Sequence, residues 1–196
     1  MSEQVAVQRG MALNEYLDRS ALRAFELLDG DVCEMSPSVS KHSLLIRALF
    51  RALDALTAYG EQWEAFSEVT FVPPEQSAAN WLRDALVPDI ALFEKAQFAA
   101  WRAQTPDADS RPVALVPALV AEVLSPHDRH SDVARKVQRY LALGVRLIWI
   151  VDPQVSQVTV YRRGSNQATL LSYDDALTAD DLLPGFCLPL AQFFAL

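Results

Sequence analysis

One acidic residue lies in the middle of the most hydrophobic run of the chain. Glu122 interrupts the apolar segment from Val116 to Ser125, whose composition is otherwise typical of a strand buried on both faces. Moving a lone ionised carboxylate into the protein interior costs several kcal/mol or more, unless the group is paired, protonated or bound to a metal. The sequence therefore predicts that Glu122 has a partner nearby.

Length and composition favour one folded domain over residues 1–196, because 51% of the residues are hydrophobic and 21% are charged. Cys33 and Cys187 lie far apart, so we expect both to be reduced and buried, with no zinc site, in a cytoplasmic protein. No apolar stretch approaches the ~20 residues that cross a bilayer, and the N-terminus lacks the pattern of a signal peptide. We expect no membrane association.

The charge is unevenly distributed along the chain. The net charge of -8 argues against simple non-specific binding of nucleic acid. Residues 127–146, however, contain five basic and two acidic side chains, a local net charge of +3. The basic residues are Arg129, Arg135, Lys136, Arg139 and Arg146. This strip is compatible with a phosphate-bearing ligand, and equally with an ordinary solvated helix face.

Hydrophobic periodicity and turn residues predict the secondary structure. Helices are expected over residues 10–19, 40–59, 95–102 and 131–143, strands over 69–72, 88–93, 116–125 and 145–151, hairpins over 25–35 and 157–173, and loops over 74–83 and 105–112. Asp29-Gly30 supplies the turn of the first hairpin, and Gly60 is expected to end the long helix. The apolar tail, residues 182–196, is expected to pack against the body.

The order of these elements predicts the fold class. A strand-helix-strand crossover between residues 119 and 151 makes its two strands parallel, and such a crossover is right-handed. Apolar residues occur at both parities of these strands, so both faces of the sheet are expected to be covered. The chain is therefore predicted to be an α/β protein with three α/β/α layers and a mixed central sheet.

Asp89 is the candidate partner of Glu122. Asp89 begins one predicted strand and Glu122 lies near the end of the next, so the two would meet at one edge of the sheet if these strands are antiparallel. Two adjacent carboxylates repel unless a cation lies between them, and oxygen ligands suit Mg²⁺ or Mn²⁺. The alternative is a structural salt bridge of these carboxylates with Arg146 or Lys136.

Lys136 lies on the border of the inward face of the following helix, near Val133, Val137 and Tyr140. A lysine at such a border can bury its stem and hold its ammonium near a metal site. There it could orient a nucleophilic water or stabilise the charge that develops on a phosphate. The simpler alternative is a solvated lysine on a helix surface.

Several short motifs carry a resemblance to a known family. They are Phe25-Glu26-Leu27-Leu28-Asp29-Gly30, Met35-Ser36-Pro37 with His42, Pro88-Asp89, Val120-Ala121-Glu122-Val123-Leu124-Ser125-Pro126, Lys136 with Tyr140, Gly144-Val145, Trp149-Ile150-Val151-Asp152-Pro153 and Leu183-Pro184-Gly185. Each is weak alone, but their order and spacing are specific. Over nearly its whole length the chain resembles the PD-(D/E)XK nuclease superfamily, and more closely its Uma-type family of small bacterial restriction endonuclease-like proteins.

The resemblance implies a restriction-endonuclease-like fold and a Mg²⁺-dependent phosphodiesterase site. Asp89 and Glu122 match the metal-binding carboxylates, and Glu26 and His42 match further family positions. The superfamily lysine is expected two residues after the glutamate, where this chain has Leu124. The Uma-type family places it on the next helix, which corresponds to Lys136 here.

The leading hypothesis is a metal-dependent endonuclease that hydrolyses DNA through a metal-activated water. Asp89 and Glu122 would hold Mg²⁺ (or Mn²⁺), and Lys136 would help to position the water. The basic residues Arg129, Arg135 and Arg139 could bind flanking phosphates, and analogy with the superfamily suggests a homodimer. Two alternatives stay open: a catalytically degenerate interaction module that keeps the nuclease fold, and a phosphoesterase acting on RNA or nucleotides.

Overall fold

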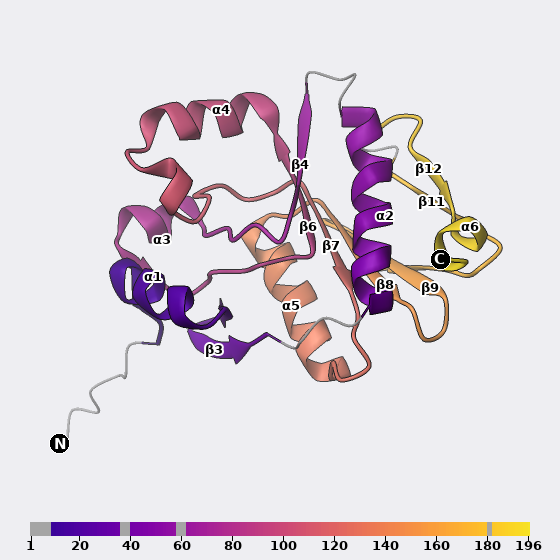
Figure 1. Cartoon of the computed structure of the whole chain (residues 1–196), viewed down its shortest axis with the longest axis horizontal. Coiled ribbons are helices and arrows are strands. Elements are labelled where there is room, and N and C mark those ends of the chain that lie inside the picture. Colours follow the sequence, from indigo (N-terminus) through magenta and orange to yellow (C-terminus); the bar gives the residue numbers. More distant parts are fainter. Residues whose placement is uncertain (1–8, 36–39, 58–61, 180–181) are drawn as a thin grey trace.

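The computed structural model describes residues 9–35, 40–57, 62–179 and 182–196. A six-stranded sheet forms its centre, in the order β10-β9-β8-β7-β6-β4 (Figure 1). The strands are β4 (Trp63–Ser67), β6 (Ile90–Glu94), β7 (Leu119–Val123), β8 (Leu147–Asp152), β9 (Gln157–Arg162) and β10 (Thr169–Leu171). Neighbouring strands are antiparallel except β7 and β8, which are parallel, so the sheet is mixed as predicted.

Helices cover both faces of this sheet. They are α1 (Leu13–Leu22), α2 (Ser40–Thr57), α3 (Pro74–Ala78), α4 (Lys95–Gln104), α5 (His130–Leu143) and α6 (Leu190–Phe194). On one face, α2 and α6 pack Leu45, Leu49 and Leu190 against the sheet. On the other face, α5 packs Val137 and Tyr140 against it. The predicted α/β fold with a mixed central sheet and helices in layers around it is confirmed.

Two further strand pairs and one bridge build the N-terminal part of the molecule. Short strands β1 (Met11–Ala12) and β5 (Trp81–Leu82) pair with each other, and β2 (Phe25–Leu28) pairs with β3 (Asp31–Glu34). The predicted turn of the β2–β3 hairpin is present, with Asp29 and Gly30 both at positive φ. Leu27 bridges to Ala85, and a separate apolar cluster, which includes Tyr16 and Leu82, supports this part.

Several boundaries differ from those predicted. The strand expected over residues 69–72 is absent from the described structure, where Phe71 makes only isolated bridges to Leu86 and Val113. One edge of the sheet is formed instead by β4, which precedes residues 69–72 in the chain. The expected loop over 74–83 contains α3, which begins at Pro74, and β5. The expected helix end at Gly60 lies outside the described residues.

The C-terminal tail packs against the body as predicted, through α6 and a hairpin of β11 (Ala176–Thr178) with β12 (Cys187–Pro189). Cys33 and Cys187 are both free, as expected. Neither is fully buried as expected: Cys33 is half-buried, and Cys187 is exposed because it lies on the short strand β12 at the surface. None of the helices in the described residues is both long and apolar enough to cross a membrane.

Candidate active site

The sheet register places Asp89 beside Glu122. Ile90 on β6 lies opposite Ala121 on the antiparallel strand β7, so one residue further along each strand Asp89 comes opposite Glu122. The Val123 amide donates a hydrogen bond of 2.6 Å to Asp89 Oδ2 and fixes the carboxylate at this end of β7. The predicted meeting of the two acidic residues at one sheet edge is confirmed.

Lys136 reaches into this edge from α5. Its Nζ lies 2.8 Å from Glu122 Oε1 and 3.0 Å from Glu26 Oε2, and only 19% of its side chain is exposed. The ammonium therefore bridges two carboxylates and does not point into solvent as a surface lysine would. Gly144 ends the helix in the left-handed conformation, with φ of 107°, which allows the chain to turn back into β8.

Glu26 comes to the same place from the N-terminal hairpin. Its Oε1 accepts a hydrogen bond of 2.8 Å from the Val87 amide, two residues before Asp89, while its Oε2 faces Lys136. Glu26 is among the few charged residues that are buried. Sequence reasoning placed Glu26 near the site only through the family resemblance, and the structure brings it into direct contact with Lys136.

His42 lies in the first turn of α2 and faces Asp89. Its Nε2 is 3.5 Å from Asp89 Oδ2, while its Nδ1 is buried and has no hydrogen-bond partner among the described residues. The contact with the Asp89 carboxylate raises the pKa of His42 above its ordinary value, although burial opposes this. A protonated His42 would add a second positive charge to the site, against the Asp89 carboxylate.

Tyr140, which the sequence offers only as a family marker with Lys136, is a further residue of the site. Its hydroxyl donates a short hydrogen bond to Glu122 Oε1, the same oxygen that Lys136 contacts, and its ring stacks near Phe71. The signal in the sequence was its position one turn after Lys136 on the inward face of the helix.

The charges of the site do not balance within the protein. Burial raises the pKa of Glu122 to about 7, and repulsion from Asp89 and Glu26 adds to this effect, while Lys136 opposes it. Burial alone would lower the pKa of Lys136, but the Glu122 and Glu26 carboxylates outweigh it and raise that pKa above its ordinary value. Lys136 is therefore a permanent cation at neutral pH, not a proton acceptor.

A cavity of about 360 Å³ opens over these groups. Glu26, His42, Asp89, Glu122 and Lys136 all line it, so the five predicted catalytic residues share one cavity. Further acidic side chains on its wall are Glu34, Glu68, Asp128 and Asp132. A cavity with this many carboxylates repels anions unless cations enter it.

The three arginines proposed for phosphate binding lie in different environments. Arg129 and Arg135 line the cavity, and no ion pair holds Arg129 among the described residues. Arg135 contacts Asp31 and donates a hydrogen bond of 3.0 Å to the Leu28 carbonyl. Arg139 is absent from the described lining of the cavity, because its guanidinium is bound to the buried Asp84.

The donor set fits a hard divalent cation. The described residues contain no group of three or more His, Cys, Asp or Glu side chains arranged to hold a metal. Asp89 and Glu122 nevertheless offer carboxylate oxygens in one cavity. The pKa of Glu122 is raised mainly by burial, and the nearby charges of Asp89 and Glu26 add to this effect. Mg²⁺ is commonly held by one or two carboxylates, with water and substrate phosphate completing its shell. Two such ligands are therefore sufficient.

Fold and site together define an α/β protein with an acidic, lysine-containing cavity at one edge of its sheet. The model of the Uma2 family, described as "Putative restriction endonuclease", matches residues 13–191, and the chain belongs to this family. A crystal structure of "a putative nuclease belonging to DUF820" from Anabaena variabilis is similar, with a TM-score of 0.76 and 18% sequence identity. The similarity covers 94% of this chain and 98% of that one. No curated protein matched the chain.

Proposed function

We propose that this cavity hydrolyses phosphodiester bonds of DNA with Mg²⁺ or Mn²⁺ held by Asp89 and Glu122. The observation that carries the proposal is the buried Lys136 ammonium, within 3.0 Å of both Glu122 and Glu26 and beside Asp89 in one cavity. Family membership supports a nuclease in general. The metal and the deoxyribose preference are our inference from the donor set and from the family description.

Lys136 and Tyr140 have different roles in the proposed hydrolysis. A bound Mg²⁺ would neutralise phosphate charge and make a nearby water more acidic. Lys136, held as a cation by its two glutamates, can orient that water or stabilise the negative charge that develops on the phosphate. Tyr140 donates to Glu122 Oε1 and leaves the other oxygen, Oε2, free of this contact and able to face a ligand.

Glu122 can also hold a proton at physiological pH, because its pKa lies at about 7. Without a cation the carboxyl group is about half protonated at neutral pH. Ligation requires the ionised form, so cation binding must release a proton from Glu122 in part of the population. Glu122 can therefore bind a cation at neutral pH, although only part of the population is ionised before the cation binds.

The basic side chains on the cavity wall suit a phosphate backbone. Arg129 and Arg135 lie where a strand entering the cavity would pass, since both belong to its lining. If both contact phosphates, the log-log slope of DNA affinity against salt should be about -2. Salt-independent affinity, or an absence of binding at low salt, would count against DNA as the substrate.

The decisive experiment is nicking of supercoiled plasmid by the purified protein with Mg²⁺ or Mn²⁺. Glu122→Ala and Lys136→Met should abolish nicking, while Glu15→Ala, a change to an exposed glutamate paired with Arg19 on α1, should not. Equal cleavage by wild type and Glu122→Ala would refute the assignment. Sedimentation of the same sample tests the expected homodimer.

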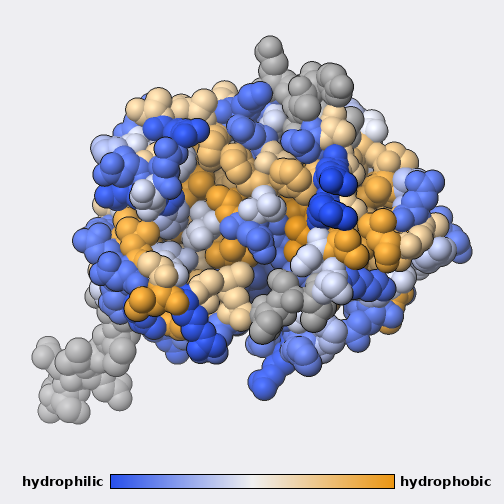
Figure 2. Space-filling model, viewed as in Figure 1, coloured by the Kyte–Doolittle hydropathy of each residue, from blue (hydrophilic) through white to orange (hydrophobic). Residues whose placement is uncertain are grey.

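Two other functions predict different outcomes. A phosphoesterase for RNA or nucleotides would use the same site, and substrate profiling with matched DNA and RNA oligonucleotides separates it from the first proposal. A degenerate interaction module predicts no Mg²⁺-dependent heat in calorimetry and no cleavage. Figure 2 shows apolar areas on one face of the molecule, with hydrophilic side chains between them.

A further inference from the structure

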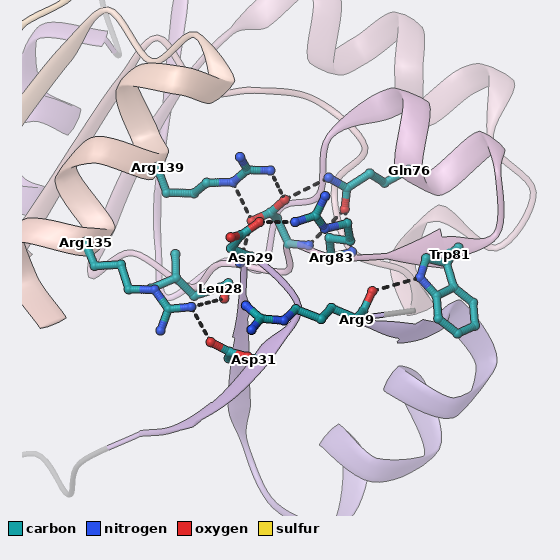
Figure 3. A network of polar contacts seen from close by, with 10 residues as sticks. Arg9, Leu28, Asp29, Asp31, Gln76, Trp81, Arg83, Arg135 and Arg139 are labelled. Carbon is teal, nitrogen blue, oxygen red and sulfur yellow. Dashed lines mark hydrogen bonds and ion pairs between the residues drawn. The ribbon is translucent and has the colours of Figure 1, made fainter. Parts of the chain in front are cut away.

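Asp84 is a further buried carboxylate, which lies outside the cavity and takes no part in the proposed chemistry. The side chain of Asp84 has no exposed surface. It accepts a hydrogen bond of 2.7 Å from Arg139 Nε, a shorter one from Arg139 Nη2, one of 2.8 Å from Gln76 Nε2 and one of 3.1 Å from the Asp29 amide. Figure 3 shows Arg139, Gln76 and Asp29 converging on this point from three elements. The charge of Asp84 is thus fully satisfied.

Asp84 belongs to a chain segment that leads directly into the candidate active site. The next residue, Ala85, exchanges two backbone hydrogen bonds of 2.9 and 3.0 Å with Leu27 on β2. The amide of Val87 then donates to Glu26, and Asp89 follows two residues later. A displacement of this segment would therefore move Asp89 and the partner of Glu26 together.

Arg139, the partner of Asp84, belongs to α5, the helix that carries Lys136. Arg139 follows Lys136 by three residues, so the two side chains lie on the same side of α5, about 4.5 Å apart along its axis. The helix and the N-terminal part of the molecule are thus joined at neighbouring points. Lys136 contacts Glu26 inside the cavity, and Arg139 contacts Asp84 outside it.

We propose that Asp84 and Arg139 are positioning residues that fix α5 against residues 84–89 and so hold Lys136, Glu26 and Asp89 in their catalytic arrangement. This inference rests on the function proposed above. A buried ion pair can often be replaced by apolar residues without loss of stability, whereas its two-point geometry specifies one orientation. Arg135 repeats the contact one turn earlier, on Asp31 and the Leu28 carbonyl, at a more exposed position.

The test uses a double variant that removes both charges, Asp84→Asn, which keeps the shape of the side chain, with Arg139→Gln, which keeps a polar side chain but shortens it. Neither member is then left as a buried unpaired charge, so the fold should persist. We expect kcat for plasmid nicking to fall about tenfold with KM changed less than about twofold, because small displacements of catalytic groups act on the chemical step. Arg83→Gln is the matched control, since Arg83 is about half exposed and pairs with Asp29 in the same network.

Hydrogen exchange measured by NMR gives a readout that needs no activity. In the double variant the Val87 amide, which donates to Glu26, should exchange at least about tenfold faster, while amides in β7 and β8 keep wild-type rates. Arg139→Lys, which keeps the charge without the two-point contact, should fall between. Unchanged exchange at Val87, unchanged kcat, or faster exchange throughout the sheet would each overturn the proposal. If the wild type cuts no DNA, the proposed function fails, and exchange at Val87 alone decides whether the positioning contact exists.

Discussion

The burial of Glu122 makes a quantitative prediction about stability. The carboxyl group has a pKa of about 7 in the folded protein against 4.5 for an unperturbed glutamate. Between these two pH values the folded state binds more protons than the unfolded state, so stability is fully present below 4.5 and is lost as pH rises through 7. For this one group, the linkage relation gives a loss of about 2–3 kcal/mol between pH 5 and pH 8.

Glu122→Gln isolates this contribution, because glutamine keeps the shape and cannot ionise. We expect the free energy of unfolding of the wild type, relative to the variant, to fall by about 2–3 kcal/mol between pH 5 and pH 8. Urea titrations of both proteins at several pH values in that interval, without divalent cations, measure the difference directly. The other titrating groups cancel to first order in the comparison. Parallel stability curves for the two proteins would refute the conclusion that Glu122 is buried without full compensation.

The remaining predictions concern the cation, His42 and the core. Because ligation needs ionised Glu122, the apparent Mg²⁺ affinity should weaken about tenfold for each pH unit below 7 and level off above it, as calorimetry across pH 5.5–8.5 would show. Asp89→Asn should lower the pKa of His42, since the Asp89 carboxylate is what raises it, and NMR titration of the imidazole measures the change. Leu49→Ala, which empties a fully buried position between α2 and the sheet, should cost about 2–5 kcal/mol in urea unfolding.

The part of the site that could be predicted from sequence is the part set by strand order. An acidic residue at the start of one strand and another at the end of its antiparallel neighbour must lie close together, and Asp89 and Glu122 do so. Lys136 could be placed because helical periodicity gives the direction of a side chain. His42 and Glu26 had no such signal of their own. Their contacts join elements far apart in sequence, and only the family resemblance pointed to them.

Predictions from the local sequence pattern were wrong where tertiary contacts determine the structure. Val69 to Val72 has strong β propensity, yet the edge strand is β4, in which only Trp63 and Ala65 are buried. The prediction of a strand over residues 69–72 was based on β propensity. It missed β4, where buried and half-buried residues alternate only weakly. The sequence predicts that Arg139 binds phosphate. Nothing near it in sequence reveals the buried carboxylate of Asp84, which is 55 residues away along the chain.

The free energy of ionising the buried Glu122 affects both the stability of the fold and the proposed binding of a cation. Keeping Glu122 ionised in the folded protein costs on the order of 3 kcal/mol, the equivalent of a pKa difference between 4.5 and about 7. Lys136 and Tyr140 already contact this carboxyl group and do not remove the cost. A divalent cation at Asp89 and Glu122 would remove it, and the energy recovered would appear as affinity for the cation. Glu122→Gln should therefore stabilise the cation-free protein at pH 8 and weaken cation binding, whereas a purely structural salt bridge would lose stability on the same change.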